Sequence, residues 1–130
     1  MSDEFPAEIA QFIDQHIESL AQLEVLLLLR EEPQRAWKTA EIAKALYITT
    51  EMADPLLADM GRRGFASVLP PASVSYSYGL SGSNTDRLVG QLAALYQERR
   101  VAVISLIYSK PMNKVQTFAE AFRLRKENQP

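Results

Sequence analysis

The order of local signals in residues 18–80 decides the fold, and this stretch reads ESLAQLEVLLLLREEPQRAWKTAEIAKALYITTEMADPLLADMGRRGFASVLPPASVSYSYGL. Residues 20–30 are apolar on nearly every side, which predicts a helix at the centre of a domain. Two more helical segments follow, at 39–46 and at 50–63, on either side of a tight break at Tyr47–Ile48–Thr49. These signals predict three helices in close succession.

The end of this stretch predicts a β-hairpin. Apolar and aromatic residues alternate with serines and a glycine from 73 to 80, the period-two pattern of a strand with one buried face. Residues 66–69 are the expected partner strand, and the prolines at 70 and 71 suit the turn because proline has no N–H to donate within a sheet. A short extended segment around Trp37, expected to be buried, precedes the second helix. The fold class predicted from this order is a mainly α winged helix-turn-helix with a small β-hairpin.

Further helices are expected on both sides of this core. We treat residues 1–130 as one domain, in which the winged-helix core at 18–80 is followed by a C-terminal helical part at 84–127. That part is predicted to contain a long helix from 84 to about 108 and a last helix at 114–126. The fold therefore has additional N- and C-terminal helices.

The end of the predicted long helix points to self-association. Residues 101–108 are apolar on every side, which is more than one small domain readily covers, so a homodimer is expected through the C-terminal helices. The predicted interface residues are Val101, Ile104, Ile107, Tyr108, Phe118 and Phe122.

Composition indicates an ordinary folded domain and argues against several kinds of site. Hydrophobic residues make up 47% and charged residues 23% of the chain, as in globular proteins. There is no cysteine and only one histidine, His16, so no metal or cofactor is expected, and His16 is interpreted as a surface or boundary residue. No enzyme activity is expected. The apolar runs are too short to span a bilayer and the acidic start is unlike a signal peptide, so we expect a cytoplasmic protein without membrane contact.

The order of elements from about Leu20 to Leu80 resembles that of the MarR-like bacterial regulators, which are winged helix-turn-helix proteins. The segments 23–30 and 118–126 are also similar to those of small uncharacterised bacterial winged-helix proteins, a likeness that brings no known activity. The first resemblance implies a DNA-binding transcriptional regulator that acts as a dimer on two half-sites. It would place these residues on the face of the second helix that approaches the major groove: Thr50, Glu51, Ala53, Asp54 and Ala58.

The charges of residues 39–65 allow two kinds of partner, DNA or a basic protein. Residues 39–65 hold three basic and four acidic residues, whereas helices that bind DNA usually present Arg, Lys, Asn or Gln. For a transcriptional regulator, the expected DNA contacts are Lys44, Thr50, Arg62 and Arg63. The alternative is a winged-helix protein–protein interaction module whose acidic helix binds a basic protein partner.

Because of Pro55, the sequence is consistent with two starting points for the second helix. If this helix begins at Thr50, the proline lies in its interior and removes a backbone hydrogen bond. If Asp54 is the cap, Pro55 takes the first helical position, which tolerates proline, and the helix is little more than two turns long.

Overall fold

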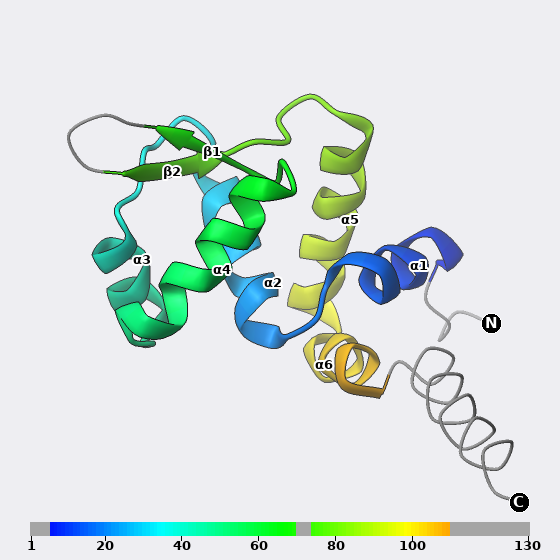
Figure 1. Cartoon of the computed structure of the whole chain (residues 1–130). Helices are drawn as coiled ribbons and strands as arrows, with labels where there is room; N and C mark the ends of the chain where they lie inside the picture. Colours follow the sequence, from blue (N-terminus) through cyan, green and yellow to red (C-terminus); the bar gives the residue numbers. More distant parts are fainter. Residues whose placement is uncertain (1–5, 70–73, 110–130) are drawn as a thin grey trace, which may run out of the picture.

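The computed structural model describes residues 6–69 and 74–109, and it confirms the predicted winged-helix fold (Figure 1). The described part is mostly helical and contains one two-stranded antiparallel sheet. No helix within the described ranges is long and apolar enough to cross a membrane. The elements in chain order are α1 (Ala7–His16), α2 (Leu20–Glu31), α3 (Thr39–Leu46), α4 (Thr50–Arg62), β1 (Ala66–Leu69), β2 (Ser75–Tyr78), α5 (Asn84–Glu98) and α6 (Arg100–Ser109).

The central helix, α2, begins where the sequence supplies a cap. The hydroxyl oxygen of Ser19 accepts a hydrogen bond from the backbone N–H of Gln22 at 3.1 Å, which satisfies one of the free N–H groups at the helix start. Leu23, Leu26 and Leu29 are fully buried, and burial of each such side chain stabilises the fold by about 1.5–3 kcal/mol. Because α2 contacts α3, α4 and β2, it forms the support on which the helix-turn-helix is built.

The second helix of the helix-turn-helix, α4, begins at Thr50. The side chain of Thr49 accepts a hydrogen bond from the N–H of Met52 at 3.1 Å and caps the helix, so Pro55 lies in its interior. The lost backbone hydrogen bond and the crowding at this proline cost about 3 kcal/mol. Met52 is 50% exposed, because the inward face of α4 is formed by Ala53 and Leu57, which lie about 100° and about 140° around the helix axis from it.

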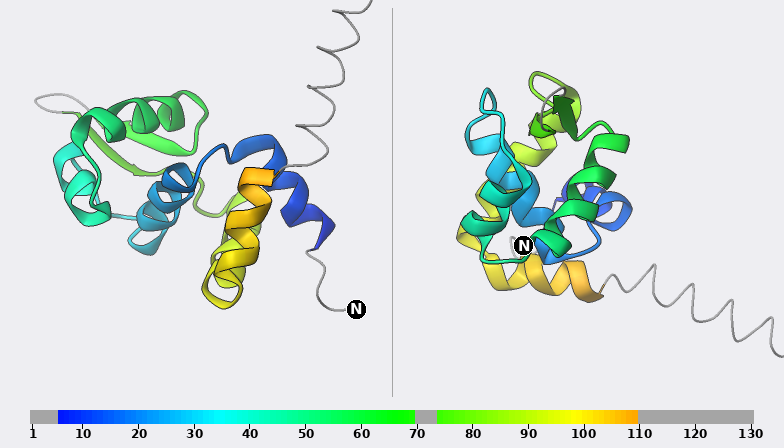
Figure 2. Two further views of the ribbon diagram at one scale, coloured as in Figure 1. Left: turned by 90° about the horizontal axis from the view of Figure 1, so that it is seen from below. Right: turned by 60° about the vertical axis from the view of Figure 1, so that its left-hand side comes forward.

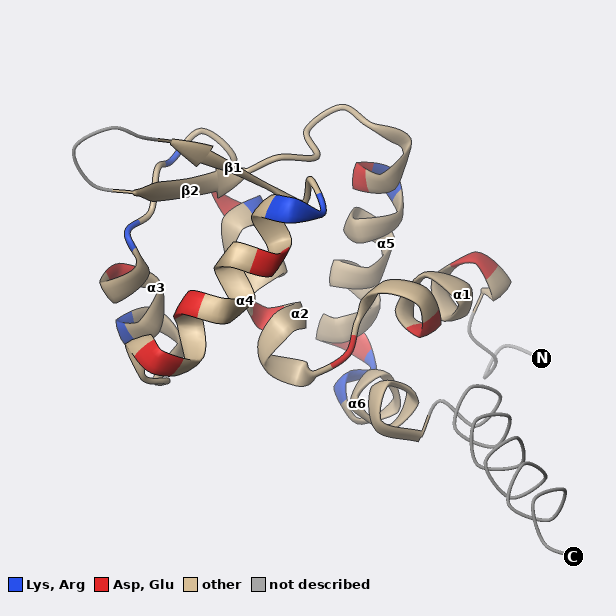
Figure 3. Ribbon diagram, viewed as in Figure 1, with Lys and Arg blue, Asp and Glu red and all other residues tan. Residues whose placement is uncertain are grey.

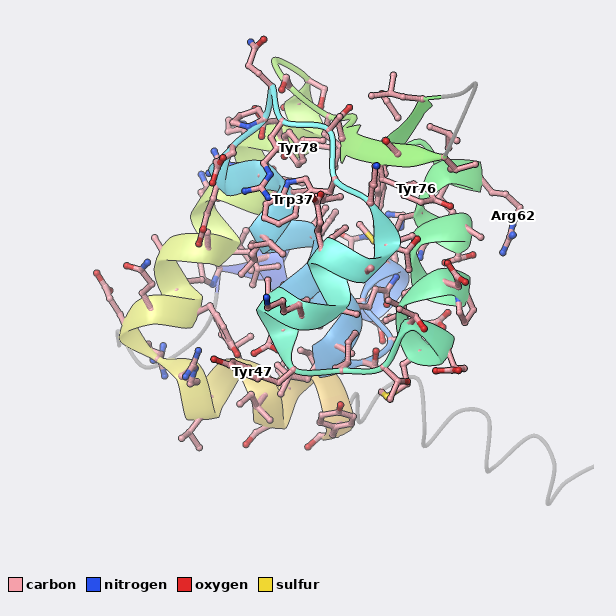
Figure 4. All side chains as sticks on the ribbon, turned by 90° about the vertical axis from the view of Figure 1, so that its left-hand side faces the viewer. Trp37, Tyr47, Arg62, Tyr76 and Tyr78 are labelled. Atoms are coloured by element: carbon pink, nitrogen blue, oxygen red, sulfur yellow. The ribbon has the colours of Figure 1, made fainter. Side chains whose placement is uncertain are left out.

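The hairpin pairs β1 with β2 and is extended by a single bridge to Trp37. The N–H of Trp37 donates to the carbonyl of Tyr76 at 2.8 Å, and the N–H of Tyr76 donates to the carbonyl of Trp37 at 2.7 Å. Trp37 is buried, as predicted, with Tyr76 and Tyr78 beside it (Figure 4). β2 is shorter than the predicted strand at 73–80. Val74 lies outside it and is 50% exposed.

The helical part after the hairpin differs from its prediction. A single helix from 84 to about 108 was expected, but Arg99 leaves the helical conformation, with φ −135° and ψ 56°, and separates α5 from α6. The break turns α6 across the end of α5, so that Val103 and Ile107 join the core. Helix α1 packs against both α5 and α6 (Figure 2). The expected helix at 114–126, with Phe118 and Phe122, lies outside the described residues.

Candidate nucleic-acid interface

The outer face of α4 is the candidate surface. In Figure 3, acidic residues follow one another along this helix, and basic residues gather at its end beneath the hairpin. Thr50, Glu51 and Asp54 are all exposed at the start and middle of the helix. The face therefore offers hydroxyl and carboxylate groups along most of its length and positive charge only at its far end.

Three of the four predicted DNA contacts are exposed. Lys44 lies on α3 and Thr50 at the first position of α4, so the turn between the two helices holds them in one region of the surface. Arg62 lies at the opposite end of α4, and Figure 4 shows it pointing away from the body of the molecule. Its side chain is 70% exposed and pairs with Asp59 at 3.1 Å. These cations and the hydroxyl thus lie at the two ends of α4 rather than in one patch.

Arg63, the fourth predicted contact, points elsewhere. Its side chain is only 25% exposed, and its guanidinium lies against the end of α1 instead of the outer face of α4. One nitrogen donates to Asp59 at 3.1 Å, while another donates to the backbone carbonyl of His16 at 2.9 Å. Arg63 therefore faces α1, although it shares the Asp59 carboxylate with Arg62.

Lys38 is an exposed cation near this surface that our sequence reasoning missed. It stands between Trp37, which pairs with β2, and the first residue of α3, so it lies between the hairpin and the helix-turn-helix. Its backbone N–H donates to Glu41 at 3.0 Å, which fixes the start of α3. Its place directly after the buried Trp37 is the signal that could have identified it.

A polar network centred on Asp86 holds the hairpin to the rest of the protein. Its carboxylate accepts hydrogen bonds from the Tyr78 hydroxyl at 2.5 Å and from the Arg30 Nε at 3.0 Å. The Tyr78 hydrogen bond is the main cause of the lowered pKa of Asp86, and burial together with Asp86 raises the pKa of Tyr78. Because these residues come from β2, α2 and α5, the network fixes the base of the hairpin relative to two helices.

A cavity of about 370 Å³ opens between α2 and α5. Glu24 of α2 accepts a hydrogen bond from the Tyr96 hydroxyl of α5 at 3.0 Å, and the Arg100 guanidinium lies 4.6 Å from the Tyr96 ring centroid. Burial is the main cause of the raised pKa of Tyr96, and Glu24 adds to it. Leu46 of α3 also lines this cavity, so its wall connects the helix-turn-helix with α5.

Four of the six residues predicted for a dimer interface lie on α6, where they fall into two groups, while Phe118 and Phe122 lie outside the described residues. Val101 is 76% exposed and Tyr108 is 49% exposed, while Ile104 is partly buried. Ile107 is only 2% exposed, because it packs into the core of its own chain. The outer face of α6 is therefore formed by Val101, Ile104 and Tyr108.

Comparison with known proteins identifies the fold. No family model and no curated protein matches the sequence. MepR, a transcription regulator of the Staphylococcus aureus multidrug efflux pump MepA, has a TM-score of 0.53 at 22% identity, over 94% of this chain and 91% of MepR. A MepR–DNA complex has a TM-score of 0.54 at 20% identity, over 92% and 87% of the two chains.

A second similar structure is the heme sensor PefR from Streptococcus agalactiae in complex with heme. Its TM-score is 0.53 at 17% identity, over 94% of this chain and 82% of PefR. Together with MepR, this structure confirms the winged-helix fold that the order of elements predicted.

Proposed function

We propose that this protein is a DNA-binding transcriptional regulator of the winged-helix type, that it acts as a dimer, and that it works in the cytoplasm. The observation that carries the proposal is the match of nearly the whole chain to MepR, for which a DNA complex is among the similar structures. The outer face of α4 has the position in the fold that helix-turn-helix proteins place in the major groove.

In this proposal each protomer contacts DNA at the two ends of α4. Lys44 and the Thr50 hydroxyl would bind phosphate oxygens at one end and Arg62 at the other, which sets the position of the helix on the duplex. Two protomers would neutralise about four phosphates, so a plot of log affinity against log salt should have a slope of about −4. The carboxylates of Glu51 and Asp54 repel phosphates and keep sequence-independent binding weak.

We further propose that the outer face of α6 forms the dimer contact. Val101 is three-quarters exposed although it is apolar, and Ile104 and Tyr108 extend the same helix face. Contact of this face with its symmetry mate would remove the apolar surface from water. Ile107 is left out of this interface because its side chain is used in the protomer core.

Titration of a random labelled duplex from low to physiological salt tests the proposed function. Binding with a dissociation constant of about 1–100 μM that weakens steeply as salt rises supports phosphate contacts. A protein that stays unbound even at low salt, and also fails to select any sequence from a random pool, contradicts a DNA-binding role.

The second candidate function is a protein–protein interaction module. It is favoured by the exposed carboxylates on α4 and by apolar side chains on the hairpin, where Val68, Leu69 and Val74 are 48%, 39% and 50% exposed. A basic amphipathic segment would complement both features. The same duplex titration separates the candidates, because such a module would form its complex with a basic protein while ignoring DNA.

A further inference from the structure

Arg63 joins the end of α4 to the end of α1. Its guanidinium donates to the backbone carbonyl of His16 at 2.9 Å and lies 3.3 Å from the ring Nδ1 of the same residue. A second nitrogen donates to Asp59, one turn earlier in α4, at 3.1 Å. The two guanidinium nitrogens thus link α4 to α1, and we call this set of contacts among Arg63, Asp59 and His16 the joint.

Aromatic contacts reinforce this joint. The ring of His16 lies 5.1 Å from that of Phe12 and 5.5 Å, edge to face, from that of Phe65. The guanidinium carbon of Arg63 lies 4.9 Å from the centre of the Phe65 ring. Because Phe65 directly precedes β1, the joint also includes the root of the hairpin.

The joint lies between two parts of the molecule with different proposed roles. Helix α1 packs mainly on α5 and α6, the part that we propose forms the dimer. Helix α4 and the hairpin form the part that we propose contacts DNA. The position of α4 relative to the dimer sets the spacing of the two contacts on DNA, so a contact between α1 and α4 bears directly on binding.

The hydrogen-bond chemistry of His16 requires a neutral ring. Nδ1 can accept from Arg63 only when it carries no proton, whereas a protonated ring has two donors and adds a second positive charge beside the guanidinium. Burial, with a further contribution from Arg63, lowers the pKa of His16 below its ordinary value. Neutral His16 therefore fits the joint and protonated His16 opposes it.

Other charged groups around α1 are engaged elsewhere or belong to the joint. Arg87 of α5 pairs at 3.6 Å with Glu8, eight residues before His16 and about 12 Å away along the helix. Arg100 of α6 lies over Tyr96. Arg63 contacts His16 and pairs with Asp59, and the acidic residues Asp14 and Glu18 lie two residues before and after His16 in the chain.

We propose that Arg63 is a positioning residue for DNA binding, which holds α4 against α1 through His16, and that protonation of His16 releases this joint. The inference rests on the proposed function. It predicts that acidification weakens DNA binding, the opposite of the simple electrostatic effect, since added positive charge alone strengthens attraction to phosphates. A change in binding between pH 5 and 8 can be assigned to His16, because it is the only histidine in the chain and no other side chain present has an ordinary pKa in this range.

The test compares duplex binding by the wild-type protein and by His16→Gln at about pH 7.5 and about pH 5.5, on either side of the ordinary histidine pKa. Glutamine offers an acceptor that does not titrate in this range. Wild-type affinity should be lower at pH 5.5 than at pH 7.5, because protonation of His16 opposes the contact that holds α4 against α1, while His16→Gln should show no such loss. Equal pH profiles for the two proteins would overturn the proposal.

Variants of Arg63 separate positioning from phosphate contact. Arg63→Lys keeps the charge but cannot bind Asp59 and His16 together, so it should weaken binding at pH 7.5 with an unchanged salt slope. If the neutral variant Arg63→Gln reduces the salt slope as much as Arg62→Ala does, while Arg63→Lys keeps full affinity, then Arg63 contacts phosphate. That result would overturn the positioning role.

A DNA-independent measurement separates failure of this inference from failure of the proposed function. The NMR titration of the His16 ring should give a pKa below about 6.5 in the wild type and a higher pKa in Arg63→Gln. If the two proteins show this difference in His16 pKa but the wild type never binds DNA, the proposed function and the positioning role are refuted. The contact between Arg63 and His16 is then still supported. Identical His16 titrations in the two proteins would overturn the joint itself.

Discussion

The guanidinium of Arg30 occupies the space in which a side chain on Gly90 would lie. A Cβ built on Gly90 would be 2.6 Å from the Arg30 Nη2, which is closer than non-bonded atoms approach. Arg30 reaches across from α2 at this point to pair with Asp86 of α5 at 3.0 Å. Because Gly90 has no side chain, Arg30 has room to reach Asp86 and to join the network that supports the hairpin.

Gly90→Ala tests this relationship. In an ordinary helix interior this change stabilises by about 0.5–1 kcal/mol, but here it should displace Arg30 and lose a partly exposed ion pair of similar size. We expect no net gain in the free energy of unfolding, measured with urea. The same change in an Arg30→Ala background should recover the gain of about 0.5–1 kcal/mol. Equal gains in both backgrounds would show that Arg30 does not occupy this space.

Removal of the Tyr78 hydroxyl should weaken the same network in a pH-dependent way. Tyr78→Phe should lower the free energy of unfolding by about 1–2 kcal/mol near neutral pH, because Asp86 loses a hydrogen bond to its charged form. The folded-state pKa of Asp86 is lowered, so its contribution is complete above the ordinary Asp pKa near 4 and is lost as pH falls through the lower folded value. The difference between the two proteins should therefore shrink below about pH 4.

Tyr76→Phe is the matched control for that experiment. Tyr76 lies two residues away on the same strand, and its hydroxyl makes no hydrogen bond to the described residues. Its free energy of unfolding should change by less than about 0.5 kcal/mol at every pH. A loss as large as that of Tyr78→Phe would indicate a general effect of removing hydroxyls from the hairpin.

Tyr47 lies in a conformation that favours glycine. It ends α3 with φ 59° and ψ 41°, the left-handed region, and its side chain is 95% exposed and gains nothing from burial. Tyr47→Gly should raise the free energy of unfolding by about 0.5–1 kcal/mol, whereas Tyr47→Ala should give no gain because alanine retains the Cβ that causes the strain. Equilibrium unfolding of the wild type and the two variants measures these differences. An equal gain for both variants would show that the Cβ of residue 47 causes no strain.

A charge on the outer face of α6 should prevent the proposed dimer. Val101→Glu places a carboxylate where the side chain is already 76% exposed, so the protomer should keep its fold while sedimentation shows a shift from dimer to monomer. Ile107→Glu is the contrasting variant, since its buried side chain should make the protomer unfold. A Val101→Glu protein that remains a dimer would move the interface away from this face.

The sequence predicted the elements whose cause is local. The apolar run at residues 20–30 marks the central helix, and the alternation around Tyr76 and Tyr78 marks a strand with one buried face. Each of these signals depends on neighbours within a few residues. For the same reason the order of elements was enough to identify the winged helix.

The parts that the sequence did not predict depend on distant residues. Apolar residues recur at helical spacing on both sides of the polar run at 97–100, which predicts one helix, but the chain leaves the helical conformation at Arg99 and brings Val103 and Ile107 into the core. Arg62 and Arg63 are indistinguishable in sequence, but adjacent helical positions differ by about 100° around the axis. One points to solvent and the other meets His16, a partner 47 residues away that no local pattern reveals.

If α4 contacts DNA at its ends, two charge-matched variants should differ in the salt dependence of their binding to a duplex. Arg62→Ala removes a proposed phosphate contact, while Arg87→Ala removes the same charge from α5, where Arg87 pairs with Glu8. We predict that Arg62→Ala weakens binding and reduces the salt slope of the dimer by about 2, one for each protomer, whereas Arg87→Ala keeps the wild-type slope. Equal slopes for all three proteins would show that Arg62 makes no contact with phosphate and that α4 does not bind DNA through this end.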